Sequence, residues 1–144
     1  MTFLLDVNML IALIDPAHVW HDHAHEWFER AGHENWATCP MTENGVMRIV
    51  GHPRYQNCPG SPSVVADILK GLRSLPGHIF WTDDLSLVDA EHVDPARILT
   101  SGQVTDTYLL ALARKRKGQL ATFDRRLSFA AVEAGKDALH VIGA

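Results

Sequence analysis

Short apolar segments alternate with longer amphipathic segments along the chain. The short segments are rich in leucine, β-branched and aromatic residues, and they predict strands at residues 3–7, 36–39, 78–82, 119–123 and 139–142. Apolar residues continue from 9 to 14 behind the first of them. The longer segments repeat apolar residues about every 3.6 positions. They predict helices at residues 17–32, 42–51, 63–75, 85–91, 105–117 and 126–134.

The clearest of these helices is the one at residues 105–117. Thr105 stands where a helix cap is expected, and Asp106 follows in the first turn, where the helix dipole favours a negative charge. Arginine and lysine side chains fill the last turn, and Gly118 ends the helix. Capping, charge and periodicity therefore agree on this element.

Strands that alternate with helices from end to end predict an α/β fold, with a parallel sheet covered on both faces. We expect a single domain over residues 1–144, built as a three-layer α/β/α sandwich around a mostly parallel sheet. In such sheets the functional site lies outside the carboxyl ends of the strands. Residues that directly follow a strand are therefore the first candidates for chemistry.

The composition is typical of a packed globular protein, with 47% hydrophobic and 21% charged residues among 144. No apolar segment approaches the roughly 18–20 residues of a membrane helix, and the N-terminus lacks the basic start of a signal peptide. Two cysteines form no disulfide framework. We expect a cytoplasmic protein. The net charge of −4, taken alone, argues against a nucleic-acid partner.

Four acidic residues stand apart from the acids on solvated helix faces. Asp6 ends the apolar run of the first predicted strand, and Asp124 follows the strand at 119–123, whereas Glu43 and Asp106 each stand directly behind a threonine near the start of a helix. If these termini share one edge of the sheet, the four carboxylates converge there. For Glu43 and Asp106 an alternative stays open, because an acid in the first turn also stabilises a helix through its dipole alone.

Carboxylates that converge in one cleft repel one another unless a cation lies between them. Mg²⁺ and Mn²⁺ are hard cations that prefer oxygen ligands, so either ion suits such a cluster. The chemistry that this arrangement serves is phosphoryl transfer, in which the metal polarises a phosphate and activates a bound water.

Four of the nine histidines, His18, His21, His23 and His25, crowd into one predicted helix. Their spacings of three and four residues would also suit zinc. Neither a cysteine nor an H-E-x-x-H pattern accompanies them, so we interpret them as neutral, exposed residues on a polar helix face. We assign no histidine to catalysis.

Four segments combine these features: L-L-D-V-N at residues 4–8, W-A-T-C-P-M-T-E-N-G at 36–45, T-D-T-Y-L-L-A-L-A at 105–113 and A-T-F-D-R-R-L at 121–127. In this order and spacing they resemble the PIN domain and, within that family, the VapC-type toxin ribonucleases of toxin–antitoxin pairs. The resemblance covers nearly the whole chain. It implies a PIN-like α/β/α sandwich and a Mg²⁺- or Mn²⁺-dependent endoribonuclease. Such a toxin cleaves structured or messenger RNA and so inhibits translation and growth.

By this resemblance the catalytic acids are Asp6, Glu43, Asp106 and Asp124. Asp6, Asp106 and Asp124 would bind the metal, whereas Glu43 would ligate a second ion or orient the attacking water. Asn8 and Thr122 are the supporting polar residues. Some members of the family carry another acid after the last one, where Arg125 and Arg126 stand here, so one and two metal ions both stay open.

The resemblance also implies partners. These are a VapB-type antitoxin that blocks the site, an RNA substrate, a second copy of the chain in a homodimer, and promoter DNA through the antitoxin alone, with no membrane contact. RNA needs positive charge near the site even when the whole protein is acidic. The candidates for RNA contact are Arg48, Arg125 and Arg126.

Two alternatives remain open at this point. A haloacid-dehalogenase-like phosphohydrolase is expected to carry D-x-D near its N-terminus, but here Asp6 is followed by Val7 and Asn8. A non-catalytic PIN-like module that binds RNA or protein would be favoured by the loss of an acid, and all four are present.

Overall fold

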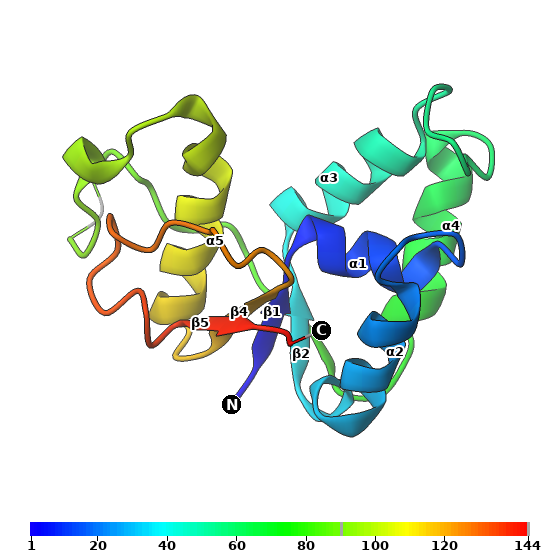
Figure 1. The fold of residues 1–144 in the computed structure, drawn as a ribbon, viewed down its shortest axis with the longest axis horizontal. Coiled ribbons are helices and arrows are strands. Elements are labelled where there is room, and N and C mark those ends of the chain that lie inside the picture. Colours follow the sequence, from blue (N-terminus) through cyan, green and yellow to red (C-terminus); the bar gives the residue numbers. More distant parts are fainter. Residues whose placement is uncertain (90, 144) are drawn as a thin grey trace.

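The computed structural model describes residues 1–89 and 91–143, and a five-stranded sheet forms its centre (Figure 1). The sheet order is β3-β2-β1-β4-β5, and every neighbouring pair is parallel. The strands are β1 (Phe3–Leu5), β2 (Trp36–Thr38), β3 (His78–Phe80), β4 (Gln119–Thr122) and β5 (Leu139–Val141). The α-helices are α1 (Val7–Ile14), α2 (His21–Arg30), α3 (Pro40–Val50), α4 (Pro62–Arg73) and α5 (Val104–Lys115).

Helices cover both faces of this sheet. Figure 1 shows α5 on one side and α1, α2, α3 and α4 on the other. Leu4 and Leu5 are consecutive and fully buried in β1, so they point to opposite faces. Leu4 packs in the cluster built on α5, and Leu5 packs in the cluster built on the other helices. The expected α/β/α sandwich is confirmed.

The first apolar segment contains both a strand and a helix. β1 ends at Leu5 and α1 begins at Val7, because Asp6 turns the chain between them: its Oδ1 accepts a hydrogen bond from the Met9 amide at 2.7 Å. The expected strand at residues 3–7 is therefore too long. A buried strand and a buried helix both give unbroken apolar runs, so the pattern alone did not separate them.

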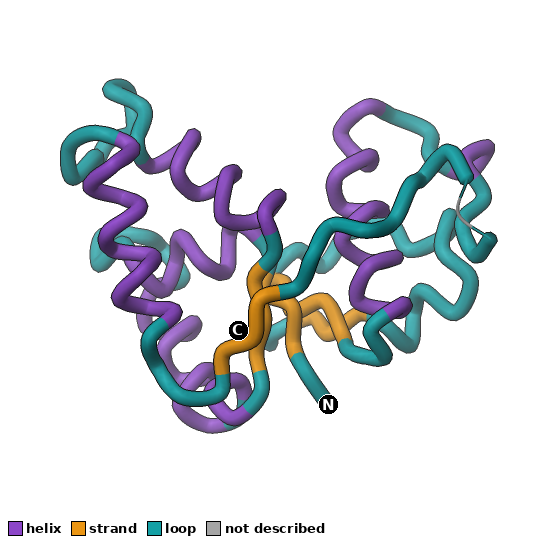
Figure 2. Tube along the Cα trace, turned by 180° about the vertical axis from the view of Figure 1, so that it is seen from behind, coloured by secondary structure: helices purple, strands orange, loops and turns teal. Residues whose placement is uncertain are grey.

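The predicted helix at residues 126–134 is wrong. This segment forms turns, and Val132 pairs with Val93 in an isolated antiparallel bridge. Leu127 and Val132 are buried in the cluster built on α5, so their apolar spacing reflects packing against that helix. Figure 2 shows the loops that surround α5.

The predicted helix at residues 85–91 includes Ala90, which lies outside the described residues. Turns occupy residues 87–89 and 91 instead of a helix. The Ser86 hydroxyl accepts a hydrogen bond from the Val88 amide at 3.2 Å, and such a local bond competes with helix formation.

The histidine-rich segment joins two helices. His21 Nδ1 lies 2.7 Å from the Ala12 carbonyl oxygen, and His25 Nε2 lies 2.7 Å from the Leu13 carbonyl oxygen. Both carbonyls belong to the last turn of α1, where no backbone amide of the helix reaches them. These two histidines and His18 are half-buried, so our interpretation of them as exposed residues is wrong, whereas His23 is exposed as expected. His18 also lies outside the predicted helix, because α2 begins at His21.

No helix among residues 1–89 and 91–143 is long and apolar enough to cross a membrane.

Candidate active site

Asp6 lies at the carboxyl end of the central strand β1 and caps α1, with only 5% of its surface exposed. Burial raises the pKa of its carboxyl group to about 6. Hydrogen bonds from Thr122 and the Met9 amide favour the charged form and oppose that rise, whereas the charges of Asp106 and Asp124 add to it. Asp6 is therefore a buried carboxylate within the electrostatic reach of two others.

Asp124 follows the neighbouring strand β4, in an exposed turn. Its backbone amide donates to the Thr122 hydroxyl oxygen at 3.0 Å, and its Oδ1 accepts from the Arg126 amide at 2.9 Å. Thr122 is fully buried and also bonds the Asp6 carboxylate. One threonine hydroxyl therefore connects the two strand-end aspartates.

Asp106 comes to the same edge from the other helical layer, in the first turn of α5. Burial raises the pKa of its carboxyl group, and the charge of Asp124 raises it further. The charges of Asp106 and Asp124 thus raise the pKa of Asp6, and that of Asp124 raises the pKa of Asp106.

Glu43 has different partners. The Thr38 hydroxyl donates to Glu43 Oε2 at 2.6 Å, and the Arg73 guanidinium lies 3.3 Å from the carboxylate. His78 Nε2 lies 2.8 Å from the same threonine hydroxyl, and burial together with Arg73 lowers the pKa of this imidazole to about 4. Neutral His78 can donate to Thr38, which in turn donates to Glu43. The charges that raise the pKa of Asp6 do not include Glu43.

The supporting and basic residues lie around this edge. Asn8 is exposed in the first turn of α1, Arg48 is exposed on α3, and Arg125 and Arg126 are exposed in the turn after Asp124. Three arginines therefore lie on elements that border the aspartates, which is consistent with the predicted RNA contact.

The aspartates fit a hydrated divalent cation better than a fully enclosed one. The atoms that they offer to a metal are all carboxylate oxygens. A cation bound between the aspartates would relieve the repulsion between their negative charges. Within the described part of the chain, no group of three or more His, Cys, Asp or Glu side chains is placed so that it could already hold a metal ion. Mg²⁺ commonly binds one or two carboxylates and keeps several waters, so an open arrangement of this kind suits it.

Asp83 is an acid that our sequence reasoning missed. It lies in the segment that follows β3, and its Oδ2 accepts a hydrogen bond from the Met41 amide in the first turn of α3 at 3.0 Å. The signal that could have found it is the one used for Asp6 and Asp124, namely an acid behind a strand.

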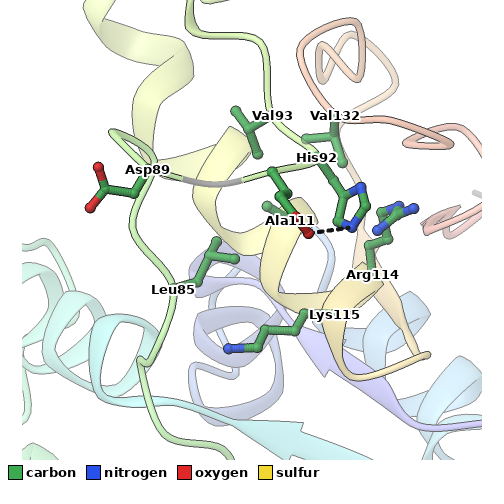
Figure 3. Close-up of a pocket in the computed structure, with 9 residues that line it drawn as sticks. Leu85, Asp89, His92, Val93, Ala111, Arg114, Lys115 and Val132 are labelled. Carbon is green, nitrogen blue, oxygen red and sulfur yellow. Dashed lines mark ion pairs between the residues drawn. The ribbon is translucent and has the colours of Figure 1, made fainter.

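A separate cavity of about 470 Å³ lies beside the later turns of α5 (Figure 3). Ala111, Arg114 and Lys115 line it from the helix, and His92 lines it from the facing loop. The dashed line in Figure 3 marks the ion pair between His92 and Glu91. Asp106 lies in the first turn of the same helix and does not line this cavity. The cavity is thus distinct from the edge that carries the aspartates.

Comparison with known proteins gives a consistent result. The sequence profile of the PIN domain matches residues 3–134, a range that contains all four predicted acids. Ribonuclease VapC44 of Mycobacterium tuberculosis is 39% identical over 132 residues, which are 92% of this chain and 92% of the relative. Ribonuclease VapC39 of the same organism is 41% identical over 128 residues, which are 89% of this chain and 92% of the relative. Ribonuclease VapC38 is 42% identical over 121 residues, covering 84% of each chain.

Proposed function

The chain belongs to the PIN-domain family as a VapC-type ribonuclease, and on that premise we propose that it is a divalent-metal-dependent endoribonuclease, the toxin of a toxin–antitoxin pair. The observation that carries the metal dependence is the buried carboxylate of Asp6, whose pKa is raised to about 6 beside two further aspartates. A buried charge with like-charged neighbours is costly without a cation.

In this proposal Asp6, Asp106 and Asp124 bind Mg²⁺ or Mn²⁺. When bound, the ion supplies a polarised phosphate, a more acidic water and a stabilised leaving oxygen. Thr122 holds the Asp6 and Asp124 segments in register through its hydroxyl. Asn8 orients the Asp6 carboxylate or a water beside it.

Glu43 is proposed as a positioning residue. Its carboxylate is already bonded by Thr38 and Arg73, which hold the side chain against α4. To orient an attacking water or a second ion, it would have to leave these partners. We therefore expect its contribution to cleavage to be smaller than that of the three aspartates.

Arg48, Arg125 and Arg126 supply the positive charge that the RNA backbone requires. The substrate is a structured or messenger RNA, and its cleavage inhibits translation and growth. We propose that the chain acts in the cytoplasm. Its partners are a VapB-type antitoxin, which blocks the site and binds promoter DNA, and a second copy of the chain in a homodimer.

A cleavage assay separates this proposal from the alternatives. The parent chain and Asp6→Asn are incubated with RNA and Mg²⁺, and Asp67→Asn, an exposed acid on α4, is the matched control. We expect the parent and the control to cleave, and Asp6→Asn to lose about 100-fold in rate. Turnover of a phosphomonoester without RNA cleavage would favour a phosphohydrolase. Binding of RNA without cleavage of either substrate would favour a binding module.

A further inference from the structure

A cavity of about 520 Å³ opens beside Asp6 and Asp106. Val7 and Thr105 line it. Val7 directly follows Asp6 in the chain, and Thr105 directly precedes Asp106. The other walls come from α3 and from Asp83, in the segment behind β3. A group bound in this cavity would therefore lie next to the proposed site of cleavage.

One wall of the cavity is apolar and tightly packed. Val7 of α1 meets Gly45 of α3 so closely that a Cβ added to the glycine would lie 2.8 Å from a valine methyl group. Met41 extends this wall along α3. An apolar wall suits the flat face of a nucleobase, because RNA-binding proteins hold unpaired bases by stacking and by contacts to their edges.

The polar groups of the cavity differ in their hydrogen-bonding character. Arg48, four residues and so one helical turn after Asn44, offers donors only. Asp83 offers acceptors only, and the bond from the Met41 amide to its Oδ2 fixes the orientation of the carboxylate. Asn44 offers both donors and acceptors. The cavity thus presents a cationic donor and an anionic acceptor to the same guest.

We propose that this cavity binds a guanine base of the RNA, next to the phosphodiester that is cleaved. This inference rests on the proposed ribonuclease function. Guanine carries two adjacent acceptors, O6 and N7, which Arg48 can bind in a bidentate manner. It also carries donors at N1 and N2, which match the Asp83 carboxylate. Uracil has a single donor, N3–H, between two carbonyl oxygens, so it gives that carboxylate one hydrogen bond where guanine gives two, and adenine lacks the O6 acceptor.

Binding without cleavage tests the inference. The Asp6→Asn chain, in EDTA, is titrated with a fluorescent oligouridine and with the same strand carrying one central guanosine, and fluorescence anisotropy is recorded. We expect the guanosine strand to bind about tenfold more tightly. Adding Asp83→Asn, which keeps an acceptor for the Met41 amide, should remove most of that preference. Arg48→Gln, at an exposed position, should do the same without affecting the fold.

Asp67→Asn in the same background is the control, because this exposed acid does not line the cavity. It should keep the full preference for guanosine. Equal binding of the two strands by the Asp6→Asn chain would overturn the inference, as would an unchanged preference in either Asp83→Asn or Arg48→Gln. If the parent chain with Mg²⁺ cleaves no RNA while the Asp6→Asn chain still prefers the guanosine strand, the proposed function is contradicted and the cavity assignment stands.

Discussion

Asp6 serves two purposes that make opposite demands on one side chain. As the cap of α1 it accepts a hydrogen bond from the Met9 amide, an interaction typically worth about 1 kcal/mol. As a buried group beside Asp106 and Asp124 it resists ionisation, and its pKa rises to about 6. The side chain of Asp6 thus stabilises the helix as its cap, whereas its negative charge is costly in this buried position. A carboxylate that binds a cation is expected to combine these two properties.

This balance predicts a pH dependence of stability in the metal-free protein. Because the folded pKa of about 6 exceeds the ordinary value of 3.8, the folded state binds the Asp6 proton more tightly. The contribution of Asp6 is therefore most favourable below pH 3.8, declines as the pH rises to about 6 and is lowest above it. The decline is on the order of 3 kcal/mol.

Asp6→Asn keeps an acceptor for the Met9 amide and removes the titrating group. Urea unfolding in EDTA at acidic and neutral pH measures the difference between variant and parent. We expect the variant to gain stability relative to the parent as the pH rises, whereas Asp67→Asn should not. A difference between variant and parent that is independent of pH would contradict the assignment of this carboxylate.

A second prediction concerns Glu43, whose carboxylate is held by Thr38 and Arg73. Glu43→Gln keeps an oxygen for the threonine and loses only charge, so we expect cleavage of RNA to fall by about tenfold, as for an indirect supporting residue. Asp106→Asn should cost about 100-fold. Single-turnover rates at saturating Mg²⁺ make the comparison, and equal losses would mean that Glu43 acts directly on the reaction.

At the scale of elements, the contact between α1 and α3 positions the site, since α1 carries Asp6 as its cap and α3 lines the adjoining cavity. Gly45→Ala would place a methyl group 2.8 Å from Val7. We expect it to destabilise the fold by about 1–3 kcal/mol through overpacking.

Gly71→Ala is the matched control, because nothing lies within 4 Å of the added methyl group and the position is inside α4. Alanine favours helices over glycine, so this variant should gain about 0.5–1 kcal/mol. Urea unfolding measures both. A neutral Gly45→Ala would show that α1 and α3 separate at little cost.

How far the sequence predicted these elements depended on the signals each one carries. α5 has periodicity, terminal charges and Gly118 behind it, and its predicted range of 105–117 lies close to the observed Val104–Lys115. Residues 126–134 carry apolar spacing and are followed by Gly135, but burial against α5 produces that spacing without a helix, and Gly135 lies in a turn. Periodicity reports which side chains are buried, whereas caps and hydrogen bonds decide the backbone.

The same limit applies to the candidate site. The topological rule that sites follow parallel strands was enough to select Asp6 and Asp124 from the sequence. It did not reveal that Glu43 pairs with Arg73, because that contact depends on how α3 and α4 pack. Asp83 satisfied the rule and was missed, since its predicted strand carried no family motif.

For the whole molecule, the net charge of −4 no longer argues against RNA. Part of the negative charge lies in the three aspartates at one edge of the sheet, where a bound cation would offset it. Exposed arginines lie on the elements around that edge. What decides RNA binding is therefore the local arrangement of charge, which a sum over the chain does not report.

The central claim is that Asp6, Asp106 and Asp124 form a divalent-metal site that supports RNA cleavage. The most direct test is the single-turnover rate of RNA cleavage measured against Mg²⁺ concentration for the parent chain and Asp106→Asn. We predict no cleavage by the parent in EDTA, full recovery with Mg²⁺, and a higher Mg²⁺ requirement for Asp106→Asn, because a ligand charge is lost. Cleavage by the parent at the same rate in EDTA would contradict the claim.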